Sequence, residues 1–325
     1  MSSIPSLLVI VPCYNEEAVL TYTNTQLTAT LRTMYSQGQV THARILYVDD
    51  GSTDTTWTLI EHLSTQYAEV MGLKLARNVG HQQALWAGLE WAAASDFDTC
   101  ISIDADLQDD LAAIPQMVNH FANGYDIVLG VRSERHSDTA FKRHTAQGFY
   151  RAMGAMGAEV TYNHADFRLL SQRACQALVS HPERNLFIRG LVMRLGFPTA
   201  HVYYQRQERT AGKSKYPLRH MISFALDGMT SFSVKPLRLI TLLGLCFILI
   251  SVVAIVYGLY AWGTRHAIPG WTSLMVSMWF IGGALLMAIG VIGEYVGKIY
   301  QEVKRRPRYF IEKTANMTPL DKEMD

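Results

Sequence analysis

The chain has 325 residues, with 29 lysines and arginines against 28 aspartates and glutamates, so its formal net charge is +1. This balance argues against a protein that binds nucleic acid through bulk positive charge. Hydrophobic residues make up 49% of the sequence, which excludes a disordered chain, and charged residues make up 18%, below the roughly 25% of an ordinary soluble domain.

The first 235 residues alternate between short β-rich runs and helical patterns. Strands are expected at residues 7–11, 45–48, 70–75, 99–103 and 127–129. Helices are expected at residues 53–67, 81–94 and around 114–121. This alternation predicts an α/β fold with a mostly parallel sheet covered on both faces. In such sheets, ligands bind beyond the carboxyl ends of the strands.

Polar residues follow each expected strand where it ends. The sharpest group is Asp104-Ala105-Asp106, followed by Gln108, and a second acidic pair is Asp49-Asp50. In an extended segment, side chains two residues apart point to the same side, so Asp104 and Asp106 can address one metal ion. Two carboxylate pairs at one sheet edge repel each other unless a divalent cation lies between them and a ligand. Oxygen ligands of this kind suit Mg²⁺ or Mn²⁺.

Several common catalytic motifs do not occur. The sequence contains no GxxxxGK[ST] phosphate loop and no HExxH, GxSxG or GxGxxG pattern. Its four cysteines show neither a CxxC pair nor a metal-ligand spacing, which favours free thiols in a reducing compartment.

Two long stretches, 239–263 and 267–293, contain no charged residue, and each is long enough for a membrane helix. Lys235 and Arg238 precede the first stretch, and several basic residues follow the second. This charge distribution predicts two transmembrane helices with both chain ends in the cytoplasm. The segment before them has an apolar helical stripe beside basic residues, so we expect a helix in the cytoplasmic membrane interface. Packing of that helix against the soluble domain is the alternative.

An ordered series of motifs resembles glycosyltransferase family 2, and especially its bacterial polyprenyl-phosphate members of the bactoprenol glucosyltransferase type. Dolichol-phosphate mannose synthases are also similar. The resemblance spans roughly 5–312, and the segments that carry it are residues 11–17, 49–54, 77–81, 104–109, 166–170, 181–185, 206–215 and 293–300. The resemblance implies a GT-A fold, a Rossmann-like sheet in the cytoplasm joined to juxtamembrane amphipathic helices and two transmembrane helices.

The implied organisation has four parts. They are a GT-A domain at 1–212, an interfacial helix segment at 213–235, two transmembrane helices within 236–298, and a basic cytoplasmic tail at 299–325. The resemblance thus implies a multi-pass protein of the bacterial inner membrane, with both termini and the catalytic domain in the cytoplasm.

The resemblance also implies roles for individual residues. Donor-binding residues would be Pro12, Tyr14, Glu16, Asp50, Asp104, Arg206, Arg209 and Lys215. Metal ligands would be Asp106 and Gln108, with Asp104 beside them, and the acceptor phosphate would be held by Arg132 and Arg143. The catalytic carboxylates would be Asp104, Asp106 and Asp166, and we expect Asp166 to orient the nucleophile. The role of His81 stays open between chemistry and a helix cap.

These roles describe an inverting, metal-dependent transfer of a hexose to undecaprenyl phosphate, for modification of cell-envelope glycans such as the O-antigen of lipopolysaccharide. Glucose from UDP-glucose is the first choice of donor, and UDP-N-acetylhexosamine, GDP-mannose or a modified pentose are alternatives. A non-catalytic scaffold that retains the fold is a second alternative. The expected partners are a nucleotide sugar, a polyprenyl phosphate lipid, the membrane and a second copy of the chain, without nucleic acid.

Overall fold

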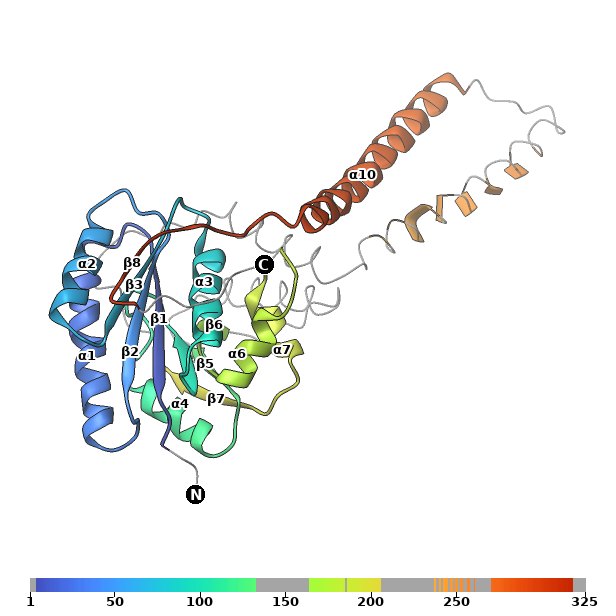
Figure 1. The fold of residues 1–325 in the computed structure, drawn as a ribbon. Coiled ribbons are helices and arrows are strands. Elements are labelled where there is room, and N and C mark those ends of the chain that lie inside the picture. The colour runs from blue at the N-terminus through green and yellow to red at the C-terminus, as the bar shows by residue number, and fades with distance from the viewer. Residues whose placement is uncertain are drawn as a thin grey trace. The chain divides into compact units, whose positions relative to one another are not determined.

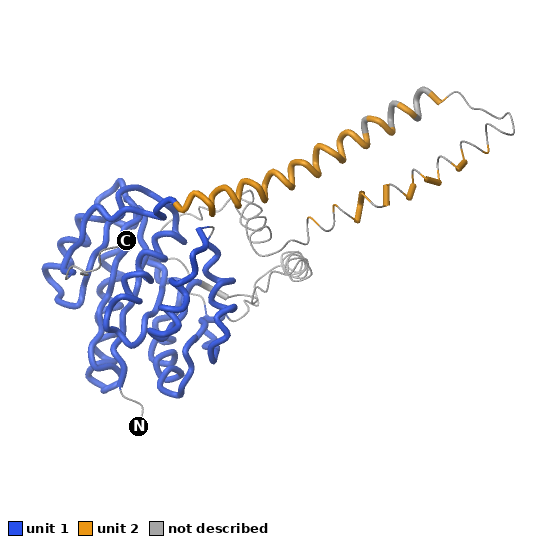
Figure 2. The backbone as a smooth tube through the Cα atoms, turned by 45° about the vertical axis from the view of Figure 1, so that its right-hand side comes forward, with its two compact units in different colours: residues 1–147, 159–215, 306–325 blue, residues 148–158, 216–305 orange. Residues whose placement is uncertain are grey.

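The structure is a computed structural model, which describes residues 4–132, 164–184, 186–205 and 270–317, together with scattered positions between 237 and 260. The chain divides into two compact units (Figure 2). The first unit joins residues 1–147, 159–215 and 306–325, and the second joins residues 148–158 and 216–305.

The first unit contains an eight-stranded sheet in the order β7-β5-β6-β4-β1-β2-β3-β8 (Figure 1). Its strands are β1 Leu7–Cys13, β2 Ala43–Asp49, β3 Val70–Leu75, β4 Thr99–Ser102, β5 Ile127–Arg132, β6 His164–Ser171, β7 Thr199–Tyr204 and β8 Ile311–Ala315. Strands β4, β1, β2 and β3 are parallel neighbours, whereas β6 and β8 run antiparallel to their partners. The four parallel strands therefore end at one edge.

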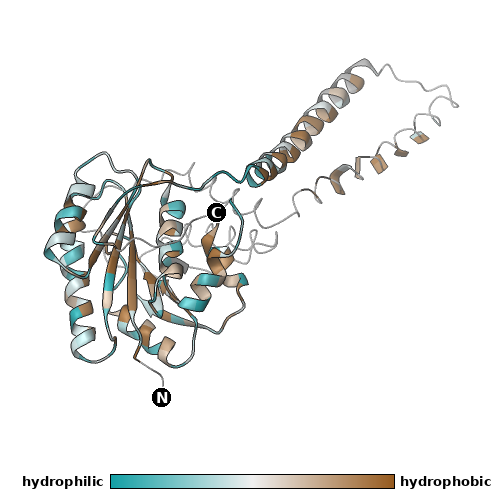
Figure 3. Ribbon diagram, in the orientation of Figure 1, coloured by the Kyte–Doolittle hydropathy of each residue, from teal (hydrophilic) through white to brown (hydrophobic). Residues whose placement is uncertain are grey.

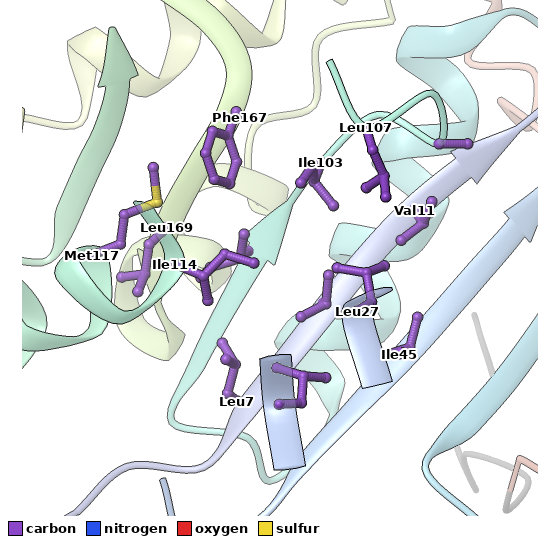
Figure 4. Packing of buried hydrophobic residues seen from close by; sticks show 14 of the residues in the cluster. Leu7, Val11, Leu27, Ile45, Ile103, Leu107, Ile114, Met117, Phe167 and Leu169 are labelled. Atoms are coloured by element: carbon purple, nitrogen blue, oxygen red, sulfur yellow. The ribbon is translucent and has the colours of Figure 1, made fainter. Parts of the chain in front are cut away.

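Helices cover both faces of this sheet. They are α1 Leu20–Ser36, α2 Thr56–Gln66, α3 His81–Ala94, α4 Ala113–Ala122, α6 Gln172–Val179 and α7 Ile188–Arg194. On one face, Leu7, Val9 and Val11 of β1 join a core with buried residues of α1, α2 and α4 (Figure 4). On the other face, α3 lies close to the sheet, because a Cβ added at Gly88 would lie 2.4 Å from Cγ2 of Ile10.

The residues that the apolar pattern of the sequence predicts to be buried are buried in the structure. All seven residues of β1 are buried, as expected for a strand covered on both faces. Ile114, Met117 and Val118 of α4 are buried, which confirms the predicted helical stripe. The five predicted strands are present as β1 to β5, and the fold is the expected α/β architecture.

The second unit contains α10 Trp271–Lys304, a helix of 34 residues. Among the described residues, one helical segment is long and apolar enough to cross a membrane, Phe280–Lys304 of α10. Figure 3 shows the predominance of hydrophobic residues along this helix. The other predicted span, 239–263, is described only at scattered helical positions, and the predicted interfacial segment 213–235 lies outside the described residues.

The segment predicted as a basic tail at 299–325 contains regular secondary structure. The helix α10 continues to Lys304, and residues Ile311–Ala315 form strand β8, which pairs with β3 in the sheet of the first unit. No strand was predicted in this segment, in which Glu312 and Lys313 leave no apolar alternation. Main-chain pairing with β3, rather than an apolar side-chain pattern, holds this strand in the sheet.

Candidate active site

The loops after β1 and β2 are joined by side-chain to backbone hydrogen bonds. The backbone N–H of Asn15 donates to Oγ of Ser52 at 2.9 Å, and Oδ1 of Asn15 accepts from the N–H of Thr53 at 2.9 Å. Farther along the same loops, Oε2 of Glu17 accepts from both the N–H and the hydroxyl of Thr55. The two loops therefore form one wall at the carboxyl edge of the sheet.

Asp50 fixes the third loop to this wall. Its two carboxylate oxygens accept from the N–H groups of Val79 and Gly80 at 2.8 and 2.9 Å. Burial raises the pKa of Asp50, and these two hydrogen bonds oppose that shift. Gly51 permits the close approach, because its φ is +64° and an added Cβ would lie 2.5 Å from the carbonyl carbon of Arg77. Asp50 thus positions the start of α3.

His81, the first residue of α3, lies between two carboxylates. Its Nε2 atom is 3.8 Å from Oδ1 of Asp104 and 3.6 Å from Oδ2 of Asp166. Desolvation lowers the pKa of His81, but the interaction with Asp166 and the charges of both carboxylates outweigh it and raise the pKa to about 9. His81 is therefore a cation near neutral pH, positioned between the residues predicted to act on donor and acceptor.

Two arginines hold Asp166 from the other side. Arg168, which is 2% exposed, bonds to Oδ1 of Asp166. Arg189 of α7 donates to both carboxylate oxygens, at 3.1 Å from Nε and 2.8 Å from Nη2. Burial raises the pKa of Asp166, but His81, Arg189 and Arg168 together hold it well below its ordinary value. Asp166 is consequently an ionised carboxylate with a low affinity for protons.

The segment Asp104-Ala105-Asp106 forms a turn after β4 rather than the extended run that the sequence argument assumed. Ala105 is buried, whereas Asp104 and Asp106 on either side of it are partly exposed. Desolvation raises the pKa of Asp104, as do Asp166 and other nearby carboxylates, whereas His81 lowers it. The turn thus keeps both carboxylates accessible, although by a different backbone path.

The residues after this turn connect the acidic motif to β5 and β7. Gln108 is 7% exposed, and its N–H lies 3.3 Å from Oδ1 of Asp106. Asp109 is buried and accepts from Nη2 of Arg132 at 3.1 Å and from the hydroxyl of Tyr204. The side chain of Arg132 is 28% exposed, so Asp109 orients this arginine while leaving part of it accessible.

The described residues group no three histidine, cysteine, aspartate or glutamate side chains closely enough to hold a metal ion. A divalent ion at Asp104 and Asp106 would therefore need oxygen atoms from a bound ligand. Mg²⁺ is commonly held in that way, by one or two carboxylates together with substrate phosphates. The two accessible carboxylates fit this mode of binding.

Comparison with known proteins shows the family to which the chain belongs. Residues 8–179 match the family Glycosyl transferase family 2, and residues 235–299 match the GtrB C-terminal hairpin. The chain belongs to glycosyltransferase family 2. It is a glycosyltransferase, and the unit that holds the mixed sheet is its GT-A domain, called the catalytic unit below.

Relatives of this glycosyltransferase match it over nearly the whole chain. The uncharacterized glycosyltransferase YkoT of Bacillus subtilis is 49% identical, over 98% of this chain and 96% of its own length. The SfII prophage-derived bactoprenol glucosyl transferase of Shigella flexneri is 37% identical, over 95% of this chain and 98% of its own. Glucosyl-3-phosphoglycerate synthase from Mycobacterium tuberculosis, solved with Mn²⁺, UDP and phosphoglyceric acid, is 17% identical with a TM-score of 0.45, over 70% and 76% of the two chains.

The predicted site residues of this glycosyltransferase fall into two groups. Those at the carboxyl edge of the sheet or in the loops beyond it are Pro12, Tyr14, Glu16, Asp50, Asp104, Asp106, Gln108, Arg132 and Asp166. Of these, Asp50 is engaged by backbone N–H groups, so its direct contact with a nucleotide stays a prediction. Those outside the described residues are Arg143, Arg206, Arg209 and Lys215.

Sequence reasoning gave no role to Arg168, Arg189 or Tyr204. Arg168 is two residues from Asp166 on the same strand, so the alternation of side chains along β6 could have indicated their contact. Arg189 and Tyr204 reach the site from α7 and β7, and only the tertiary fold brings them there.

Proposed function

We propose that this glycosyltransferase transfers glucose from UDP-glucose to undecaprenyl phosphate at the cytoplasmic face of the bacterial inner membrane, with inversion at the sugar. The observation that carries the proposal is the placement of accessible Asp104 beside the His81–Asp166–Arg189 cluster at one sheet edge. Relatives named bactoprenol glucosyl transferase, 37% identical over more than nine-tenths of both chains, support this acceptor and sugar.

The donor side of the proposal rests on the acidic turn. Asp106 would hold Mg²⁺ or Mn²⁺ together with the donor diphosphate, with Asp104 and Gln108 beside it. Such an ion neutralises charge that develops on a leaving nucleoside diphosphate. The nucleoside would bind at the neighbouring wall, which contains Pro12, Tyr14, Glu16 and Asp50. Positive charge near the diphosphate would come from the predicted contacts of Arg206, Arg209 and Lys215.

The acceptor side rests on Arg132. Asp109 and Tyr204 orient its guanidinium, and the exposed part of the group would bind the lipid phosphate, with Arg143 as its predicted partner. One phosphate oxygen attacks the anomeric carbon, the bond from that carbon to the UDP oxygen breaks, and UDP leaves. Attack opposite the leaving group turns an α-linked donor into a β-linked glycosyl phosphate.

No strong base is required for this step. A phosphomonoester has a second pKa near ~6, so the acceptor is already largely a dianion at neutral pH. The low pKa of Asp166 agrees with that requirement, because such a carboxylate orients neighbouring cations rather than accepting a proton. We therefore assign Asp166 to the orientation of His81, Arg168 and Arg189 around the acceptor phosphate.

The membrane part of the proposal rests on α10 and on the match of residues 235–299 to a C-terminal hairpin. We propose two spans with both chain ends in the cytoplasm, which places the acceptor phosphate and the catalytic unit on the same side of the bilayer. Association of several copies is a further prediction, testable by crosslinking in native membranes.

A donor panel tests the proposal. Purified full-length protein receives undecaprenyl phosphate, Mg²⁺ or Mn²⁺ and one nucleotide sugar per reaction, and lipid products are measured by mass spectrometry. Asp106→Ala serves as the metal-site variant, and Asp96→Ala, which changes an exposed acid after α3, is the matched control. We expect a hexosyl lipid from UDP-glucose with the native chain and the control but not with Asp106→Ala. Product from another nucleotide sugar alone would replace the donor, and failure of all donors would refute the proposed reaction.

A further inference from the structure

The segment that follows α10 returns to the catalytic unit and is fixed there at several points. The N–H of Ala76 donates to the carbonyl oxygen of Phe310 at 2.9 Å, and Nζ of Lys74 lies 3.1 Å from Oε2 of Glu312. Farther on, Nδ2 of Asn316 donates to the carbonyl oxygen of Val70 at 2.8 Å. Residues 306–325 therefore belong to the catalytic unit, although they follow the apolar helix in sequence.

Among the described residues of this returning segment, Arg308 is the most enclosed cation. Its side chain is 9% exposed, and its guanidinium carbon lies 4.5 Å from the centre of the Trp86 ring on α3. Its Nη1 atom donates to Oε1 of Glu90, one turn later on the same helix, at 3.1 Å. Glu90 also accepts from the indole N–H of Trp86 and from the hydroxyl of Tyr309. We call these four residues, Arg308, Tyr309, Trp86 and Glu90, the Arg308 clamp.

The same guanidinium also holds a second element. Its Nη2 atom donates to the main-chain carbonyl oxygens of His181 and Glu183, at 3.2 and 2.7 Å. These residues directly follow helix α6. Arg308 therefore joins the side chains of α3 to the backbone of the chain that leaves α6.

Both joined elements lead to the Asp166 cluster. Helix α3 begins with His81, which contacts Asp166, and the chain after Glu183 continues into α7, which carries Arg189. The two elements meet again near the site, where Oε1 of Gln82 accepts from the N–H of Ile188 at 3.3 Å. Arg308 and the Gln82–Ile188 hydrogen bond therefore both join α3, which carries His81, to the chain that leads from α6 to Arg189.

We propose that Arg308 is a positioning residue of the active site, which acts through α3 and the 181–183 segment to set the geometry of His81 and Arg189 around Asp166. This inference rests on the proposed function only for its effect on turnover. An arginine is required because its planar fork donates to a carboxylate and to carbonyl oxygens in different directions while its face stacks on an indole. A lysine keeps the charge but has neither the fork nor the flat face.

Arg308→Lys in the full-length protein is the central variant, because it keeps the charge and lowers the risk of a folding failure. Glu90→Gln and the double variant complete a cycle. Arg32→Lys is the matched control, since Arg32 also bonds to a glutamate, Glu69, and lies over a tyrosine, Tyr67, but at the opposite end of the strands.

Two measurements are made on each variant. The first is hydrogen exchange followed by mass spectrometry on peptides covering residues 81–86 and 186–194, compared with peptides from β1. The second is kcat and KM for UDP-glucose, with undecaprenyl phosphate as acceptor. We expect Arg308→Lys to speed exchange in the two site peptides but not in β1, and to lower kcat about tenfold with KM changed less than twofold.

The cycle separates positioning from general stability. If Arg308 acts through Glu90, the kcat of the double variant should be no lower than the kcat of the more affected single variant. The proposal would be overturned if exchange at the two site peptides is unchanged, or if Arg308→Lys changes KM but not kcat. It would also be overturned if the effects of the two substitutions on kcat are fully additive, or if Arg32→Lys has an equal effect. If the native chain yields no lipid product, the proposed function fails, and the exchange measurement alone then decides whether Arg308 controls the site.

Discussion

Asp166→Asn is the substitution that probes the site most sharply. The change keeps the shape of the side chain but removes the charge shared by Arg168, Arg189 and His81. Arg168 is 2% exposed, so in the variant its guanidinium stays buried without its ion-pair partner. Removing one partner of a buried ion pair costs about 3–5 kcal/mol. For a unit of this size, that loss lowers the melting temperature by about 6–20 °C.

A nearby pair in the same unit provides the control. Asp126 is also buried and bonded to an arginine, but the side chain of Arg173 is 64% exposed and regains water when its partner is neutralised. Asp126→Asn should therefore lower the melting temperature by less than Asp166→Asn. Arg168→Met, combined with Asp166→Asn, removes the stranded cation and should restore part of the lost stability without restoring turnover.

The pH dependence of this effect has a definite sign. The pKa of Asp166 is lowered on folding, so its stabilising contribution is present above its ordinary pKa of about 3.9 and is lost as pH falls through the folded value. The difference in melting temperature between the native chain and Asp166→Asn should be largest from about pH 5 to 6.5 and should shrink in stronger acid. It should also decline as pH rises above about 6.5, because Asp166 helps to raise the pKa of folded His81 to about 9, and the stability that comes from this shift is lost as pH rises toward that value. Scanning fluorimetry of the detergent-solubilised proteins measures it. Equal melting temperatures at pH 7 would refute the buried ion-pair argument.

Three further predictions concern the loops and the returning segment. Gly51→Ala places a Cβ 2.5 Å from the backbone of Arg77 at a φ of +64°, so we expect weaker UDP binding by calorimetry and a loss of at least about 1–2 kcal/mol in stability. Asp109→Asn removes the counter-charge of Arg132 and should raise KM for the lipid acceptor several-fold in steady-state kinetics, with KM for the donor unchanged. Deletion of residues 306–325 removes β8 and should lower both the melting temperature and turnover, whereas a dispensable tail would leave both unchanged.

The sequence predicted the elements whose side chains follow a simple period. The apolar runs of β1 to β5 and the helical stripe of Ile114, Met117 and Val118 determine the parallel core because burial on both faces requires such residues. Asp104 and Asp106 were identifiable because acidic residues directly after a buried strand lie at the ligand-binding edge of the sheet. These inferences depend on local sequence and one topological rule.

The remaining features depend on contacts between distant parts of the chain. Strand β8 carries Glu312 and Lys313 and shows no apolar alternation, so its pairing with β3 has no signature in the sequence. Arg189 and Arg308 are ordinary basic residues until α7 and the returning segment bring them to Asp166 and Glu90. The turn at Asp106 is another example, because its backbone path follows from Leu107 at a φ of 46° rather than from a strand period.

A stoichiometric single-turnover reaction tests the central claim most directly. The full-length protein in excess over labelled UDP-glucose is given undecaprenyl phosphate, and both UDP and the lipid product are quantified while NMR determines the anomeric configuration. The account predicts one UDP released for each glucosyl phosphoryl lipid formed, with a β linkage. Release of UDP without lipid product, or an α-linked product, would contradict it.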